Sequence, residues 1–376
     1  MTTVVKAAGA AEFLALVPRL LGYTAVRSAV LVPTARGRSL GAMRLDLPPD
    51  DPAMIDMFAS TAVGFVCRVP DVDAFVVVVY TDEPIGDALP FAPLVAALRL
   101  RAAASGLTIV DALVVAGDGW GSHDDPDLPP HGRPLAEIVT RMPSGQAALP
   151  ADQASGAALP PHSAAERRRV GAAMRSLRTS LEVLCGIPGG PHTERVDPAA
   201  LEAACALDDL PRLIERALAW APDDLPAMDA ALIGWCLARP SLRDVALVQW
   251  AGDIVDGEDA LDAQRRWEDG EEYPADLAAV MWGEGRRPDP ERLGRALELS
   301  RHVAALLSVR QRPGPLAVCA WLSWALGRST HAERYAQLAQ EIDPEHGLAD
   351  IIRSFVAAGH LPDWAFHRRP GIPLGT

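Results

Sequence analysis

Residues 74–80 read Ala-Phe-Val-Val-Val-Val-Tyr, and this run decides the fold class of the first half of the chain. The stretch 73–81 is almost continuously apolar, which is typical of a strand buried on both faces of a sheet. A helix is predicted over residues 93–105, and a second apolar strand follows over 107–116. Two such strands separated by a helix indicate an α/β domain with a right-handed crossover.

The residues before this run supply the other elements of the sheet. A helical apolar face over residues 13–21 precedes two strands, predicted over 28–32 and 42–47. The turn residues 35–38 between these strands make them a hairpin. A further helix is predicted over 50–68, because acids and proline are favoured in a first helical turn. The predicted order is therefore α-β-β-α-β-α-β, a mixed sheet flanked by helices.

The composition changes after this sheet. Residues 117–134 are predicted as a polar loop, and 143–163 as an interdomain linker because they are rich in Ala, Pro, Gly and Ser. No strand pattern remains from residue 164 onward, so the second half is predicted as all-helical. The predicted domains are an α/β domain over 1–142, the linker over 143–163, a helical domain over 164–359 and a C-terminal tail over 360–376.

The end of the helical half is partly similar to a tetratricopeptide repeat. Such a repeat has Gly between its two helices, small residues at fixed positions in the second helix, and a closing Pro. Gly327, Ala332, Ala339 and Pro344 fit these positions. The first helix departs from the pattern, with Leu316, Cys319 and Ala320 at the positions of Trp, Leu and Gly. One partial repeat predicts close helix packing, because a peptide-binding array needs about three stacked repeats.

Composition excludes several common functions. The 376-residue chain has a formal net charge of −14 and a single lysine, Lys6, among its 35 Lys and Arg residues. A P-loop nucleotide site and a pyridoxal phosphate site both require a well-placed lysine, so neither is expected. An acidic chain without a basic patch is not expected to bind nucleic acid. No other cofactor is indicated.

The cysteines and the apolar runs predict a cytoplasmic protein with no membrane segment. The five cysteines are odd in number, widely spaced and without a CxxC pair, so we expect buried free thiols rather than zinc ligands or disulfides. They are Cys67, Cys185, Cys205, Cys236 and Cys319. The N-terminus has no signal-peptide pattern, and the longest apolar run is far too short to span a bilayer.

Several ordered blocks resemble domain of unknown function family 4192. They are Val17-Pro18 and Leu20-Leu21-Gly22 in the first helix, the hairpin from Ser28 to Leu47 with Arg44-Leu45-Asp46-Leu47-Pro48, Asp111-Ala112-Leu113-Val114-Val115, Ala320-Trp321 to Gly327, and Asp343-Pro344. The resemblance covers most of the chain and implies a cytoplasmic, mainly actinobacterial protein. Because the family has no assigned activity, the resemblance carries over no catalytic residue. The family often continues its last strand into Arg-Trp-Trp-Ser with nearby cysteines, whereas this chain has Gly119-Trp120-Gly121-Ser122-His123.

A cluster of imidazoles and carboxylates follows the strand over 107–116, where open α/β sheets usually bind ligands. We name His123, Asp125, Asp127 and His131, beside Asp124, as candidate ligands of a divalent metal that could activate water. The alternative is a solvated polar loop, because the spacing matches no fixed metal-binding motif.

Three other short motifs are better explained structurally. The sequence Gly37-Arg38-Ser39-Leu40-Gly41 matches a GxSxG nucleophile elbow, but a strand rather than a helix follows it, which favours a hairpin turn. Gly117, Gly119 and Gly121 could cradle a phosphate, yet acids follow them where a helix N-terminus is needed. Cys185 ends a helix, where the dipole disfavours a thiolate, so burial is expected. Trp321 and Trp324 are expected in the core.

Two functional hypotheses remain. The first is a protein-interaction or scaffolding module that binds a protein partner through its helical half. The second is a small-molecule-binding or metal-assisted hydrolytic protein with its site in the loop 117–133. We favour the first, because repeat-like architecture is visible and no catalytic constellation is. The sequence leaves the oligomeric state open.

Overall fold

The computed structural model describes residues 9–86, 88–139, 151–186 and 196–366. The chain divides into two units between Ser155 and Gly156, inside the stretch predicted as a linker. Lys6, residues 143–150 of that stretch and residues 367–376 of the predicted tail lie outside the described residues.

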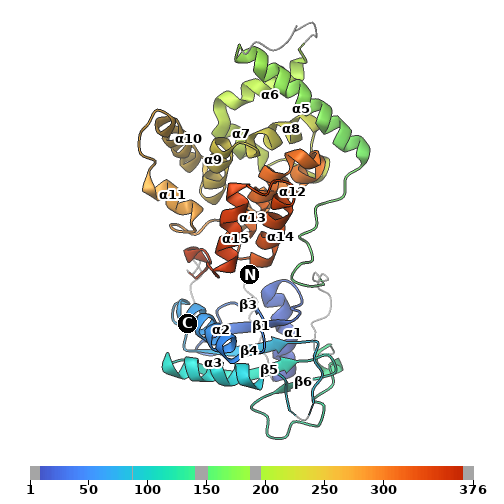
Figure 1. Ribbon diagram of the computed structural model, residues 1–376, viewed down its shortest axis with the longest axis vertical. Coiled ribbons are helices and arrows are strands. Elements are labelled where there is room, and N and C mark those ends of the chain that lie inside the picture. The colour runs from blue at the N-terminus through green and yellow to red at the C-terminus, as the bar shows by residue number, and fades with distance from the viewer. Residues whose placement is uncertain (1–8, 87, 140–150, 187–195, 367–376) are drawn as a thin grey trace. The chain divides into compact units, whose positions relative to one another are not determined.

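The first unit is built around a six-stranded mixed sheet (Figure 1). Its elements are α1 (Ala10–Leu21), β1 (Ser28–Ala35), β2 (Arg38–Ser39), β3 (Met43–Asp46), α2 (Pro52–Cys67), β4 (Ala74–Tyr80), α3 (Ala92–Ala104), β5 (Thr108–Val115), β6 (Trp120–Ser122) and α4 (Ala136–Val139). The prediction of a mixed sheet flanked by helices is confirmed. The α2 helix begins as predicted: Pro52 occupies its first turn, and the Asp51 carboxylate accepts hydrogen bonds from two backbone N–H groups.

The sheet order is β2-β1-β4-β5-β6, with β3 also paired to β1. Strand β1 runs antiparallel to β3 and to β4, with Val30 opposite Val78, whereas β4 and β5 are parallel, with Val77 opposite Ala112. Strands β3, β4 and β5 therefore point the same way, and their carboxyl ends share one edge of the sheet. This is the edge at which open α/β sheets bind ligands.

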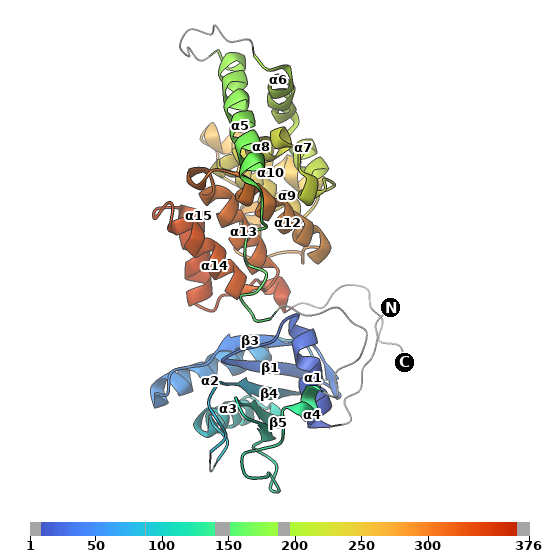
Figure 2. The ribbon, with the colours of Figure 1, turned by 90° about the vertical axis from the view of Figure 1, so that its right-hand side faces the viewer.

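Strand β4 is buried on both faces, as its valine run predicts. Val77 and Val79 contact the core under α2 and α3, whereas Val76 and Val78 contact the core under α1 and α4. Figure 2 shows α1 and α4 side by side on one face of the sheet. Two apolar layers of this kind require helices on both faces, because each face would otherwise expose its side chains to water.

Three short elements were not predicted. Strand β2 continues the hairpin beyond a two-residue turn, in which Arg36 and Gly37 both have positive φ. Strand β6 pairs antiparallel with β5, and α4 is a single turn. The prediction of residues 117–134 as loop is therefore wrong over β6. Three residues that include Gly121 are too few to give a strand pattern in the sequence.

The second unit is helical throughout its described residues. Its elements are α5 (Ala164–Leu184), α6 (Pro198–Cys205), η1 (Ala206–Asp209), α7 (Leu210–Ala217), η2 (Pro222–Asp224), α8 (Ala227–Leu237), α9 (Pro240–Ala251), α10 (Ile254–Glu268), α11 (Ala275–Met281), α12 (Pro290–Leu306), η3 (Val309–Gln311), α13 (Pro313–Ala325), α14 (Ser329–Gln340), α15 (Gly347–Ala357) and η4 (Asp363–Ala365). Helix α7 starts separately from α6, because Asp209 caps a new start and Pro211 lies in its first turn.

Helix α13 lies at the centre of this unit's core, between α12 and α14 (Figure 1). Trp321 and Trp324 are fully buried, as predicted, and each indole N–H donates a hydrogen bond to a backbone carbonyl, of Met281 and His360 respectively. Gly327 has positive φ between α13 and α14, and Ala332 and Ala339 are fully buried. These features fit close helix packing, and the tetratricopeptide assignment stays a prediction.

Among the helices that the structure describes, none combines the length and the apolar character required to cross a bilayer.

Candidate functional site

The two candidate histidines of the loop 117–133 contact different neighbours. The Nε2 atom of His123 is enclosed and has no hydrogen-bond partner among the described residues. Burial lowers the pKa of His123, and the nearby Arg99 guanidinium lowers it further. His131 has positive φ, and its Nδ1 lies 3.4 Å from the carbonyl oxygen of Ile85.

The carboxylates of this loop are paired with arginines or with backbone groups. Asp124 accepts a hydrogen bond of 2.6 Å from Arg99, and Asp125 accepts one of 2.7 Å from Arg133. The Arg133 guanidinium lowers the pKa of the Asp125 carboxyl. The other oxygen of Asp125 accepts a hydrogen bond from the backbone N–H of Asp127.

These contacts bear on whether the loop can bind a metal ion. Nowhere in the described ranges do three or more His, Cys, Asp and Glu side chains converge in a way that could hold a metal ion. The structure therefore does not bring together, as one ligand set, the four candidate residues His123, Asp125, Asp127 and His131. The metal site stays a prediction, and a stoichiometric metal content after gentle purification would support it.

The glycines of this region serve close packing. A Cβ atom on Gly117 would lie 2.8 Å from the backbone oxygen of Asp82, and one on Gly119 would lie 2.6 Å from that of His131. Gly121 packs against the Leu128 side chain, where a Cβ atom would lie at 2.7 Å. Gly117 and Gly119 lead into strand β6, which contains Gly121, and not into a helix N-terminus, so the phosphate-cradle interpretation is not supported.

Two cysteine predictions are corrected. Only Cys236 and Cys319 are buried, whereas Cys67, Cys185 and Cys205 are exposed, and all five are free thiols. Cys185 was expected to be buried at the end of α5. The buried residues of α5 end at Ser180, and Val183, Leu184 and the C-cap Cys185 lie beyond the packed part of the helix and are exposed. The Ser39 hydroxyl of the GxSxG motif is exposed in β2, which confirms the hairpin interpretation.

A cavity of ≈ 420 Å³ lies at the carboxyl ends of β3 and β4, and we name it the sheet-edge cavity. Its lining residues are Val26, Arg27, Asp46, Leu47, Thr81, Asp82, Glu83, Phe91 and Gln153. Arg27 and Asp82 approach to 3.8 Å, but both side chains are about three-quarters exposed (76% and 75%). Exposed ion pairs of this kind hold side chains only weakly in place. The sheet-edge cavity is therefore the weaker candidate for a binding site.

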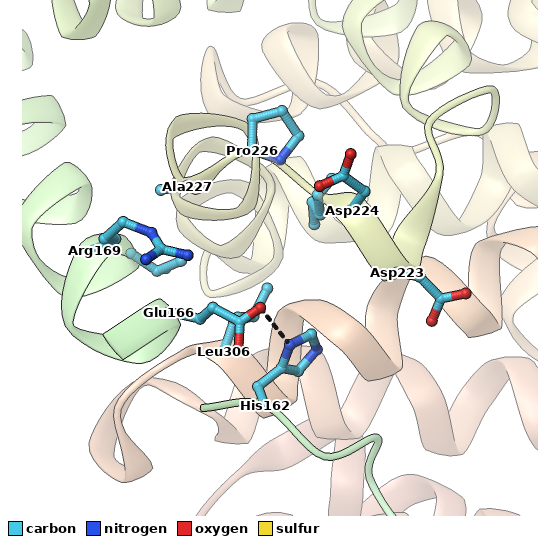
Figure 3. Close-up of a pocket in the computed structure, with 10 residues that line it drawn as sticks. His162, Glu166, Arg169, Asp223, Asp224, Pro226, Ala227 and Leu306 are labelled. Carbon is cyan, nitrogen blue, oxygen red and sulfur yellow. Dashed lines mark ion pairs between the residues drawn. The ribbon is translucent and has the colours of Figure 1, made fainter. Parts of the chain in front are cut away.

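A second cavity, of ≈ 170 Å³, lies in the helical unit, and we name it the His162 cavity. In Figure 3, Glu166 and His162 point toward one another, and the carboxylate of Asp223 points away from them. The lining residues are His162, Glu166, Arg169, Val170, Asp223, Asp224, Leu225, Pro226, Ala227 and Leu306. The cavity therefore has a charged side and an apolar side, the usual character of a ligand site.

A chain of hydrogen bonds leads from the half-exposed carboxylate of Glu298 through buried His302 to this cavity. The carboxylate of Glu298 lies 3.2 Å from Nε2 of His302, and Nδ1 of His302 lies 3.2 Å from Nε2 of His162. The two histidine side chains are only 4% and 7% exposed, respectively. The whole arrangement is held by Arg301, which donates to the second oxygen of Glu298 and to the carbonyl of Ala158. We name Glu298, His302 and His162 the imidazole relay.

The remaining charges lie at the mouth of the cavity. Glu166 lies in a capping box at the start of α5, and the hydrogen bonds from Ser163 lower the pKa of its carboxyl. The other oxygen of Glu166 lies 3.7 Å from Nδ1 of His162 (Figure 3). Asp223 approaches His302 at 3.6 Å, whereas Arg169 and Asp224 have no side-chain partner within the part of the chain that the structure describes.

Sequence reasoning missed this site. His162 and His302 lie 140 positions apart, so no local motif contains both. The only local signal was the Ser163 to Glu166 capping box, which marks a helix start and nothing more. His302 lies on the buried face of α12 beside Leu299 and Val303, where a single histidine is ordinarily a core residue.

A family model described as Domain of unknown function (DUF4192) matches residues 11–363, which confirms the resemblance recognised in the sequence. The matched region reaches from α1 to η4 and includes both units. Neither the curated proteins nor the solved structures contain a match to the chain.

Proposed function

The chain belongs to the DUF4192 family, and from the residues of this member we propose that its helical unit binds a small polar molecule in the His162 cavity. The observation that carries the proposal is the imidazole relay, in which two almost fully buried histidines are joined end to end and lead to the cavity wall. Ionisable groups with specific charge partners beside a pocket are candidates for a binding site.

The size of the cavity limits the ligand. At ≈ 170 Å³ it is smaller than the roughly 300–1,000 Å³ of cavities that enclose drug-sized molecules. The apolar side, with Val170, Leu225 and Leu306, contacts a few carbon atoms, while His162 and Glu166 supply hydrogen-bonding groups. A compact molecule with one polar end and a short apolar body fits this division.

Ligand-observed NMR of the full-length protein with a set of small polar molecules tests the proposal. Ala227 lines the cavity with a small side chain, so Ala227→Trp fills it while leaving the imidazole relay in place. We expect binding by the wild type and at least tenfold weaker binding by Ala227→Trp. Equal binding by the two proteins contradicts the proposal, provided that both unfold at similar temperatures.

A second candidate function is protein interaction through the helical half. Its support is two half-exposed tryptophans, Trp267 at the end of α10 and Trp282 after α11, which are 55% and 50% exposed. Exposed tryptophan is enriched at interaction hot spots. We expect Trp267→Ser with Trp282→Ser to lose partners that co-purify with the full-length protein. Leu100→Ser, at a 68% exposed position of the other unit, is the matched control.

A further inference from the structure

With both rings neutral, the hydrogen bonds of the imidazole relay leave each ring a single tautomer. A carboxylate only accepts, so Nε2 of His302 must carry the proton that points to Glu298. In a neutral ring the Nδ1 atom of His302 is then an acceptor. Nε2 of His162 must in turn carry the proton of the bond between the two rings. The remaining nitrogen of His162, Nδ1, is left with a lone pair.

This lone pair faces a second acceptor. The oxygen of Glu166 nearest to Nδ1 lies at 3.7 Å, beyond hydrogen-bond distance, and Glu166 is held ionised by its contacts with Ser163. Two acceptors at this separation repel each other unless a donor lies between them. The His162 side chain is only 7% exposed, so a donor between these two atoms has to lie inside the cavity itself.

The surrounding charges favour a positive donor. Two carboxylates, Glu166 and Asp224, line the cavity against one cation, Arg169, and a third, Asp223, lies fully exposed at its rim. An anion would meet this negative excess and would also lack N–H groups to give to His162 and Glu166. A protonated amine supplies both the charge and at least two donors.

We infer that the ligand of the His162 cavity is a small protonated amine with a short aliphatic body, whose N–H groups bridge Nδ1 of His162 and the carboxylate of Glu166. The inference rests on the proposed small-molecule function and narrows it to one chemical class. The aliphatic body lies against Val170, Leu225 and Leu306. Arg169, at the exposed rim, disfavours a second ammonium group at the other end of the ligand.

Titration of the full-length protein with n-butylammonium, n-butanol and n-butyrate tests the inference, because the three probes share a carbon chain and differ in the polar end. We expect n-butylammonium to bind at least tenfold more tightly than either of the others. Glu166→Gln removes the charge and keeps the capping box, which accepts Gln as well as Glu. We expect this variant and His162→Phe to weaken n-butylammonium binding tenfold or more.

Glu182→Gln is the matched control, because Glu182 lies on the same helix far from the cavity and we expect it to bind like the wild type. Two outcomes overturn the inference. If n-butanol or n-butyrate binds as tightly as n-butylammonium and Ala227→Trp abolishes that binding, the cavity binds small molecules of another class and only the inference fails. If no probe binds, or if Ala227→Trp binds all of them normally, the proposed function fails with it.

Discussion

When one nitrogen of a neutral imidazole donates a hydrogen bond, the other nitrogen can only accept one. In this protein the ring that accepts from His162 is a second imidazole, His302. The direction of the relay is set at Glu298, whose side chain is 45% exposed, where Arg301 holds one oxygen and leaves the other for His302. This one carboxylate therefore determines which nitrogen of a neutral His162 can accept a proton at the cavity.

Substitution of Arg169 tests whether the charges around the His162 cavity affect the binding of an ammonium group. The Arg169 guanidinium lines the cavity and would repel a bound ammonium. We expect Arg169→Ala to raise the affinity for n-butylammonium about twofold to fivefold, the ~0.5–1 kcal/mol typical of an exposed charge interaction. Isothermal titration calorimetry measures the change, and high salt reduces it. Arg168→Ala, on the same helix, is the control, and an equal gain there would contradict the explanation.

The cysteines give a second prediction at this scale. Burial raises the pKa of the Cys236 thiol to about 12 and also raises that of Cys319. At neutral pH we expect brief alkylation to label Cys67, Cys185 and Cys205 only, as read by peptide mass spectrometry. Labelling of Cys236 or Cys319 in the folded protein would show that the core opens more readily than the structure implies.

Among the elements, α7, α9 and α12 are joined by a polar contact in place of purely apolar packing. Arg292 donates two hydrogen bonds to Glu215, and Gln249 donates to Glu215 and to the carbonyl of Pro211. Gln249 is fully buried, and the Arg292 side chain is 12% exposed. We name Glu215, Gln249 and Arg292 the three-helix clamp.

Removing one partner of the clamp destabilises the helical unit. We expect Arg292→Met to lower the free energy of unfolding by about 2 kcal/mol, as for hydrogen bonds to a charged group. The loss stays below that of a fully buried ion pair because water can solvate Glu215, whose side chain is 37% exposed. Chemical denaturation measures it. Arg310→Met, at an exposed position of η3, is the control and is expected to change stability little.

The same clamp gives a pH dependence. Arg292 lowers the pKa of Glu215 below its ordinary value of 4.5, so the folded state gains stability from the ionised carboxylate above that pH. This gain is lost as the pH falls through the lowered pKa of the folded state. We expect wild type and Arg292→Met to differ most near neutral pH and to converge in acid. A difference that grows below the ordinary pKa of Glu would contradict this account.

Two glycines in different elements provide a matched pair. Gly119, between β5 and β6, leaves no room for a Cβ atom, whereas Gly64 in α2 has open space around it. We expect Gly119→Ala to destabilise the first unit by about 2 kcal/mol through backbone displacement. Gly64→Ala is expected to stabilise it by about 1 kcal/mol through helix propensity. Thermal unfolding distinguishes them, and equal shifts of the same sign would argue against the packing of β6.

At the scale of the whole molecule, the two units have separate apolar cores. The core of the helical unit contains no residue of the two cores that flank the sheet. We expect calorimetry to resolve two transitions, with Arg292→Met lowering one and Gly119→Ala lowering the other. A single transition moved equally by both variants would show that the units unfold as one.

The elements could be predicted from the sequence where a local pattern was strong. The valine run gave β4 and the α/β class, and Asp51 with Pro52 gave the start of α2. The site could not be predicted, because His162 and His302 meet only through tertiary packing. The loop around His123 was predicted as a metal site from its residue types and its place after a buried strand. Asp124 and Asp125 of this loop pair with arginines, which the spacing of residues in the sequence does not reveal.

The short segment before α5, residues 157–162, belongs structurally to the helical unit and determines where a fragment of that unit has to begin. Ala157 is buried in the helical core, Ala158 accepts a hydrogen bond from Arg301, and His162 completes the relay. A helical fragment that begins at residue 164, where regular structure starts, would lack Ala157 and so leave a gap in the core. It would also lack His162, one of the two imidazoles of the relay. Separate expression of the helical half should therefore begin no later than Gly156, and ligand binding by such a fragment would show that all parts of the site reside in one half of the chain.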